Sequence, residues 1–382
     1  MADNLTGPLS EEQTLLLETI RKFADETVAP GAAARDLERA FPADLWEGIA
    51  ELGLAGVPYP EAVGGVGMGF LTHALVLEEL ARACASTAMT VVAHTNLALG
   101  AIVLGGSTEQ HARWAEPLAA GDPLGALVLG AGELAPGPAL GGVTARAAAD
   151  GHVLHGSADW VMNGSRAGTL VVLAATDPAG RTAGLFVVPG DAPGLVRGAP
   201  IHTMGLRAMD IASVRFEDVR VPQDAVLGDP AGGLANAQRT LDAARVALGA
   251  VNVGIARAAL DRAATFSRER IAFGKPIATF DGSREKFALM ATSLESARQT
   301  VYAAARAQDA GGDFTNLAIA AQLEAGRAVL DVGFEALQLL GGYGYCHEYD
   351  VERYCRDAKM CEVGFDELAL VKRRLARSVV GL

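Results

Sequence analysis

The chain has 382 residues, of which 50% are hydrophobic and 20% are charged. That length is enough for about two to three structural units with a substantial core. The 45 acidic residues outnumber the 32 lysines and arginines, and the formal net charge is −13. A protein that neutralises nucleic-acid phosphates usually has the opposite balance, so we expect no nucleic-acid partner.

The sequence has no features of an exported or membrane-spanning protein. Its start, Met1-Ala2-Asp3-Asn4, lacks the basic region and apolar core of a signal peptide, and no window approaches about 18 consecutive apolar residues. The four cysteines form no C-x-x-C pair, which favours reduced thiols over a disulfide framework. We therefore expect a cytoplasmic protein without a membrane partner.

The amino-terminal region has helical periodicity. Ser10 is followed three residues later by Gln13, a pattern in which each side chain caps the backbone amide of the other residue. Apolar residues at helical spacing follow, and further helices are predicted over 42–52, 71–85 and 108–119. Gly53 is expected to end the first of these.

The middle and last parts of the chain differ in period. Short apolar runs between turn residues predict strands over 124–129, 143–149, 170–175, 185–188 and 212–216, in a mostly antiparallel unit. Long helical patterns then cover 236–270, 281–310, 316–340 and 352–380. The expected fold is α+β, with a helical domain at 1–122, a middle β domain at 123–230 and a helical bundle domain at 231–382.

Two familiar motifs are weak here. The glycine-rich segment 64–69 does not follow a strand of a βαβ unit, so a flexible turn is the better interpretation than a dinucleotide fingerprint. His152 and His155 form an H-x-x-H pattern, but an odd spacing on a strand directs the two rings to opposite faces. We predict no metal site.

Two segments of the last third suit a pyrophosphate. The first contains Arg270 and Phe273 before a Gly-Lys-Pro break, and the second runs from Gln338 to the paired glycines Gly341 and Gly342. An arginine fork binds phosphate oxygens, and exposed glycine amides offer further donors. The alternative is that both segments are simply helix C-caps.

Together and in this order, these segments resemble the acyl-CoA dehydrogenase family. The resemblance extends to Tyr59–Gly67, Leu77–Arg82, Trp160–Gly164, Phe216–Pro222 and Glu352–Lys359. It implies helical, β and helical domains, the last a four-helix bundle. It also implies FAD bound across a subunit interface, an acyl thioester substrate carried on CoA or a carrier protein, and a homotetramer or a hetero-oligomer with a related subunit.

The resemblance assigns the cofactor contacts residue by residue. Arg270 and Phe273 correspond to contacts with the FAD pyrophosphate and adenine, and Trp160 to the aromatic residue beside the flavin. Met162 offers a backbone amide to the flavin but lacks the hydroxyl that the family has there. Three further residues correspond to a loop that, in the family, reaches the pyrophosphate from the neighbouring subunit: Gln338, Gly341 and Gly342.

The sequence departs from the family where the catalytic base belongs. Aligned without a gap from Arg356-Asp357-Ala358-Lys359, the position of the family's glutamate holds Phe365. The position on the long helix where some relatives carry that glutamate holds Ala244. A flavin-contacting Thr-Glu-Pro segment of the family corresponds here to Gly130-Ala131-Gly132, which lacks the hydroxyl.

Asp366 and Glu367 are the nearest candidates for a relocated base. On a regular helix one residue rotates the side chain by about 100°, so the alternative is that both acids cap a helix over 368–380. Arg245 corresponds to a family arginine near the thioester, and its alternative role is a surface ion pair.

Three functions follow from this pattern. The chain is an FAD-dependent oxidoreductase on an acyl thioester with a relocated base or a modified reaction, a catalytically silent partner of an active relative, or a flavin-free scaffold. Flavin in the purified protein, and its bleaching by an acyl-CoA, would distinguish them.

Overall fold

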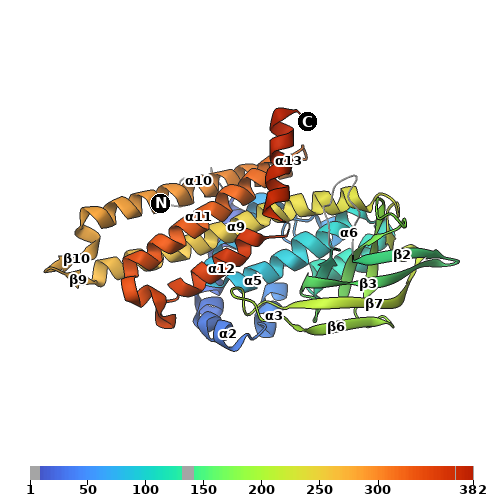
Figure 1. The fold of residues 1–382 in the computed structure, drawn as a ribbon, viewed down its shortest axis with the longest axis horizontal. Helices are drawn as coiled ribbons and strands as arrows, with labels where there is room; N and C mark the ends of the chain where they lie inside the picture. The colour runs from blue at the N-terminus through green and yellow to red at the C-terminus, as the bar shows by residue number, and fades with distance from the viewer. Residues whose placement is uncertain (1–8, 131–141, 366, 382) are drawn as a thin grey trace.

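The computed structural model describes residues 9–130, 142–365 and 367–381, and its first part is helical (Figure 1). Ser10 and Gln13 form the predicted reciprocal cap at the start of the first helix. The helical segments are α1 (Glu11–Phe23), η2 (Ala24–Val28), η3 (Ala29–Gly31), α2 (Ala32–Glu38), α3 (Ala43–Glu51), η4 (Glu61–Val63), α4 (Gly69–Ala83), α5 (Ala85–Val91), η5 (Val92–Leu99), α6 (Gly100–Gly105), α7 (Thr108–Gln110), η6 (His111–Ala115) and α8 (Glu116–Ala119).

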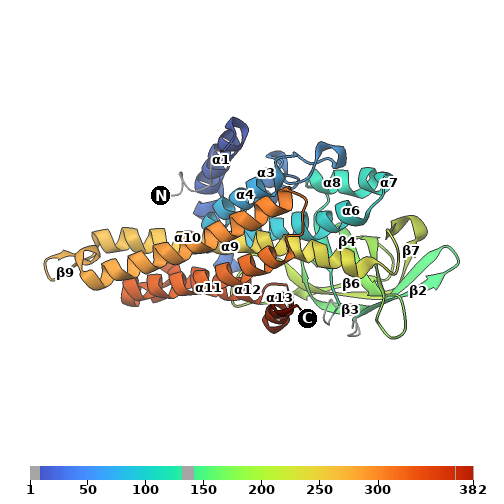
Figure 2. The same cartoon turned by 90° about the horizontal axis from the view of Figure 1, so that it is seen from above.

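The helical run Ala85–Gly105 was not predicted, because it is buried on almost every side and therefore has no amphipathic period. This run and α9 (Gly233–Glu269) are long and apolar enough to cross a membrane by length and composition. However, 83% and 89% of their most apolar stretches are buried inside the protein, as in the core helices of a globular domain. Figure 2 shows α9 running beneath its neighbouring helices toward the β sheet.

The middle part forms one twisted sheet with the order β6-β7-β3-β2-β4-β5-β8, and β1 also pairs with β4. Its strands are β1 (Gly125–Val128), β2 (Val143–Ala148), β3 (Gly151–Met162), β4 (Thr169–Ala175), β5 (Ala183–Pro189), β6 (Leu195–Pro200), β7 (Ile211–Pro222) and β8 (Val226–Leu227). The pairs of β1 and β2 with β4 are parallel and the others antiparallel, so the mostly antiparallel prediction is confirmed. β3, β6 and the two-residue β8 were missed, and the two register shifts in β3 disrupt its alternation.

The last part is a bundle of long helices with a small hairpin at its far end (Figure 1). The elements are α9, β9 (Ile271–Ala272), β10 (Lys275–Pro276), η8 (Ile277–Thr279), α10 (Asp281–Asp309), α11 (Thr315–Leu340), η9 (Gly341–Tyr345), η10 (His347–Tyr349), α12 (Val351–Val363) and α13 (Leu368–Val380). The pattern over 352–380 is therefore two helices, because Gly364 takes a left-handed φ of 63° and ends α12.

Helices α4, α9 and α10 are joined by buried ion pairs. The Glu78 carboxylate accepts from the Arg298 guanidinium at 3.0 Å and from the Tyr302 hydroxyl at 2.7 Å. Gly254 lets α9 pass close to α4, since a Cβ there would lie 2.4 Å from the Glu78 carbonyl oxygen. These contacts fix the amino-terminal helices against the bundle.

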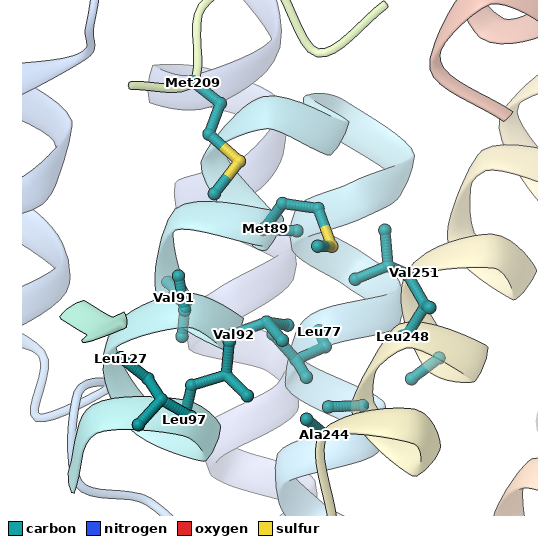
Figure 3. Close-up of a cluster of buried hydrophobic side chains, with 14 of the residues drawn as sticks. Leu77, Met89, Val91, Val92, Leu97, Leu127, Met209, Ala244, Leu248 and Val251 are labelled. Carbon is teal, nitrogen blue, oxygen red and sulfur yellow. The ribbon is translucent and has the colours of Figure 1, made fainter. Parts of the chain in front are cut away.

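The three parts meet at an apolar cluster (Figure 3). Met89 and Val92 come from the buried helical run, Leu127 from β1, and Ala244 and Leu248 from α9, and all are buried. Burial of such side chains contributes roughly 1.5–3 kcal/mol each, so this junction is rigid and positions whatever lies beside it.

Candidate functional site

Arg270 and Phe273 lie at the hairpin beyond the end of α9. Phe273 and Gly274 have φ values of 51° and 77°, which form the tight turn between β9 and β10. The Phe273 ring is 98% exposed and touches only the edge of Phe280 among the ring contacts of the described residues. Such exposure of a large apolar ring, beside an exposed arginine, is typical of a surface that another molecule covers.

The turn after α11 lies beside this hairpin. The Arg270 guanidinium stands 5.6 Å from the centre of the Tyr343 ring, which belongs to η9. Gln338, Gly341 and Gly342 are exposed, and a Cβ added at either glycine would meet no atom within 4 Å. The structure thus brings the two predicted pyrophosphate segments together within one chain.

Trp160 and Met162 form a separate group on β3. The Trp160 side chain is 62% exposed and Met162 is half-buried. The helix α9, about 55 Å long at 1.5 Å per residue, runs from the sheet side of the molecule to the hairpin (Figure 1). One chain therefore does not bring the β3 group and the hairpin group together.

The two family base positions are both apolar. Phe365 is half-buried and packs against the hydrophobic core directly after the end of α12. Ala244 is fully buried in the cluster of Figure 3, beside Leu248 and Val251. Neither side chain can take a proton, so a base would have to come from elsewhere.

Glu367 is exposed and extended, and it precedes α13. Its backbone carbonyl accepts from the Leu370 amide at 2.8 Å, but its side chain makes no cap hydrogen bond. Its carboxylate thus supports the helix through charge at most. Asp366 lies outside the described residues, as do Ala131 and Gly132 of the segment that replaces the family's Thr-Glu-Pro.

Arg245 is buried rather than at the surface. Its guanidinium is paired with the Asp242 carboxylate one turn earlier on α9. That carboxylate also accepts from the Thr315 hydroxyl at 2.9 Å and from Arg374 at 3.2 Å. The surface ion pair is therefore wrong as an alternative, and Arg245 belongs to a junction of α9, α11 and α13.

Sequence reasoning missed Gln322, on α11. Its side chain is 2% exposed, and neither its Oε1 nor its Nε2 has a hydrogen-bond partner among the residues that the structure describes. A Cβ built on Gly364 would lie 2.9 Å from this Nε2 and 3.1 Å from Leu248 Cδ2. A glutamine within the apolar pattern of α11 was the signal that could have revealed it.

Asp357 fixes the loop before β7 onto α12. Its Oδ1 accepts from the Leu206 amide at 2.6 Å, and Gly205 packs against the Arg356 backbone. Burial raises the pKa of Asp357 to about 6, against the opposing attraction of Arg353. The Asp357 carboxylate thus positions the loop before β7, whose Met209 reaches the apolar cluster of Figure 3.

Comparisons with known proteins agree over the whole length. The N-terminal, middle and C-terminal domains of acyl-CoA dehydrogenase match residues 10–122, 133–219 and 231–376. The mitochondrial short-chain specific acyl-CoA dehydrogenase of Homo sapiens is 38% identical over 93% of this chain and 87% of its own.

Solved structures have the same fold. Butyryl-CoA dehydrogenase from Megasphaera elsdenii has a TM-score of 0.94 at 31% identity, covering 98% of this chain and 99% of that one. A glutaryl-CoA dehydrogenase from Mycobacterium smegmatis in complex with FADH2 has a TM-score of 0.92 at 25% identity, covering 100% and 97%. The prolyl acyl carrier protein oxidase AnaB gives 0.92 at 25% identity, covering 98% and 100%.

Proposed function

Because this chain belongs to the acyl-CoA dehydrogenase family, we propose that it is an FAD-dependent oxidoreductase of acyl thioesters whose proton acceptor is not at the usual positions. The thioester is carried on CoA or on an acyl carrier protein, as in the named relatives. The observation that carries the proposal is the contrast between an exposed, donor-rich hairpin end and two apolar base positions, Phe365 and Ala244.

The residues present fit FAD. Arg270 offers a guanidinium, and the turn at Gly341 and Gly342 is exposed and lets a phosphate approach the backbone closely, although the Gly341 amide itself donates to the Gln338 carbonyl. Trp160 and Phe273 present large exposed rings that suit stacking against planar rings. When bound, FAD supplies the acceptor for a hydride that leaves the β-carbon of the acyl group.

The separation of these groups supports an oligomer. Arg270 and the turn at Gly341 lie beyond the far end of α9, whereas Trp160 is on a strand of the sheet (Figure 1). A dinucleotide that contacts both kinds of residue must therefore use the hairpin end of one copy and the sheet of another. We propose a homotetramer, or a hetero-oligomer with a related subunit.

The residue that accepts the α-proton is not at either family position. Removal of the α-proton requires a base within hydrogen-bond reach of it, and Phe365 instead gives that region an apolar wall. Asp366 and Glu367 are the proposed bases for ordinary α,β-oxidation. If neither residue accepts the α-proton, the protein catalyses a different reaction of the bound thioester, one that does not require a carboxylate base.

A silent partner subunit is the second candidate. It is favoured by the same contrast, because a chain that lends Arg270 and Gln338 to a neighbour's cofactor needs no base of its own. A flavin-free scaffold is the third, and an absence of flavin from the purified oligomer would support it.

The test begins with the flavin. We expect the purified protein to show a flavin absorbance spectrum, and Arg270→Gln to lower its FAD content, with the exposed Arg284→Gln as a matched control on α10. Anaerobic butyryl-CoA should perturb or bleach that spectrum without any added protein. A flavin spectrum that no acyl thioester alters would refute the enzyme and leave the silent subunit.

The base is tested in the same assay. Phe365→Glu should introduce or accelerate bleaching by butyryl-CoA, whereas Phe365→Gln, of similar size but without a proton acceptor, should not. Asp366→Asn and Glu367→Gln should abolish turnover, with FAD still bound, only where that residue is the base. Equal rates in the glutamate and glutamine variants would show that position 365 does not face the reacting carbon.

A further inference from the structure

Three aromatic rings pack together beside Arg270 at the hairpin end of the molecule. The Phe266 ring lies on α9, and its centre is 5.7 Å from that of Tyr343 and 5.8 Å from that of Tyr349. The centres of the two tyrosine rings are 5.2 Å apart. Tilted and edge-to-face pairs at such distances are favourable beyond the area that they bury, so the three rings hold one another in place.

This aromatic cluster joins the turn after α11 to the last turns of α9. Tyr343 belongs to η9 and Tyr349 to η10. The Arg262 Nε–H donates to the Tyr349 carbonyl at 3.2 Å, and the Arg262 guanidinium lies 5.7 Å from the centre of the Tyr349 ring. Arg262, Phe266 and Arg270 are spaced four residues apart, so one face of α9 carries both the contacts to the turn and the arginine.

We propose that Tyr343 positions the Arg270 guanidinium for the FAD pyrophosphate. This inference rests on the proposed FAD-dependent function and deepens it by naming a positioning residue. The guanidinium carbon lies 5.6 Å from the centre of the Tyr343 ring, within the range of a cation–π contact. Within the described part of the chain, the exposed Arg270 side chain has neither an ion pair nor a hydrogen bond, so this ring is what orients its charged end.

An oriented arginine binds phosphate at a lower cost in side-chain entropy than a free one. A tyrosine that only stabilised the turn through packing would instead act on FAD independently of Arg270. The two roles therefore differ in whether the effect of Tyr343 requires the guanidinium.

The test measures FAD binding to the apo-protein by the change in flavin fluorescence. Tyr343→Leu should weaken binding by about three- to tenfold, because it removes the cation–π contact and frees the arginine. Tyr343→Phe keeps the ring and should bind FAD within about twofold of the wild type. Tyr345→Leu makes the same change at a tyrosine of this turn that is 82% exposed, and it should also match the wild type.

A double-mutant cycle then separates positioning from packing. Arg270→Gln alone should weaken FAD binding, and the addition of Tyr343→Leu should cause a further loss of less than about twofold, because no guanidinium remains to be oriented. Tyr343→Met is a second variant that adapts its shape to the cluster, should the leucine variant fold poorly.

The outcomes distinguish this inference from the proposed function. Unchanged FAD affinity in the Tyr343 variants that lack the ring, or losses that multiply in the double variant, would overturn the positioning role while leaving FAD binding intact. Equal affinity of Arg270→Gln and the wild type would remove Arg270 from the proposed cofactor site, and this inference with it. Failure of the wild type to bind FAD at all would contradict the proposed function itself.

Discussion

The neutral His94 ring links the amino-terminal helices to the sheet through two hydrogen bonds. Protonation of the ring would break one of them. Its Nε2–H donates to the Leu118 carbonyl at 2.7 Å, and its Nδ1 accepts from the Gly125 amide at 2.9 Å. The ring is 0% exposed and meets the Trp46 ring edge-on at 4.7 Å. Protonation would place a charge in this site and remove the acceptor for Gly125.

Burial lowers the pKa of His94 from 6.5 to about 4, although the Leu118 hydrogen bond opposes the shift. The folded form therefore binds a proton less readily than the unfolded form, and stability present above pH 6.5 is lost as the pH falls toward 4. Between pH 7 and pH 5 this one group should cost about 2 kcal/mol of unfolding free energy.

The perturbation is His94→Gln, which keeps one hydrogen bond but does not titrate. At pH 7 it should destabilise the protein by about 1–3 kcal/mol. In urea unfolding at pH 7 and pH 5, its loss of stability between the two pH values should be about 2 kcal/mol smaller than in the wild type.

Trp46→Phe is the control. It loses the Nε1–H bond to the Gly121 carbonyl at 2.8 Å and is destabilised, but it retains the histidine. Its pH dependence should match the wild type. The reasoning is refuted where His94→Gln shows the full wild-type loss between pH 7 and pH 5.

Three further changes test the packing around the site, each by urea unfolding. Tyr302→Phe removes the 2.7 Å bond to the buried Glu78 carboxylate and should cost about 2 kcal/mol; no loss would mean that the carboxylate finds another donor. Gly254→Ala places a Cβ 2.4 Å from the Glu78 carbonyl oxygen and should cost about 1–3 kcal/mol, unless α4 and α9 separate freely. Asp357, with its pKa raised by burial to about 6, favours folding below pH 3.8 and loses that contribution as the pH rises through 6. In the wild type this group should add about 1 kcal/mol to the free energy of unfolding as the pH is lowered from 7 to 5. Asp357→Asn still accepts from the Leu206 amide but should lack this increase, and an unchanged increase would contradict the raised pKa of Asp357.

The sequence by itself determined the fold class and the order of the elements, because periodicity and caps are local. The Ser10 cap, the long helices and most strands could be predicted in this way. The helical run Ala85–Gly105 could not, since a segment buried on every side has no polar face to give its period. The interrupted alternation of β3 hid that strand for a similar reason.

For the candidate site too, the residue types came from the sequence and their arrangement from the tertiary structure. Its residue types, including Phe365 at the base position, could be read from the sequence through a family resemblance. Only the tertiary structure decided that Arg270 lies beside the turn at Gly341 and that Arg245 is buried against Asp242. It alone placed the unpaired Gln322 amide opposite Gly364, because contacts between α11 and the end of α12 depend on how the helices pack and leave no spacing in the chain.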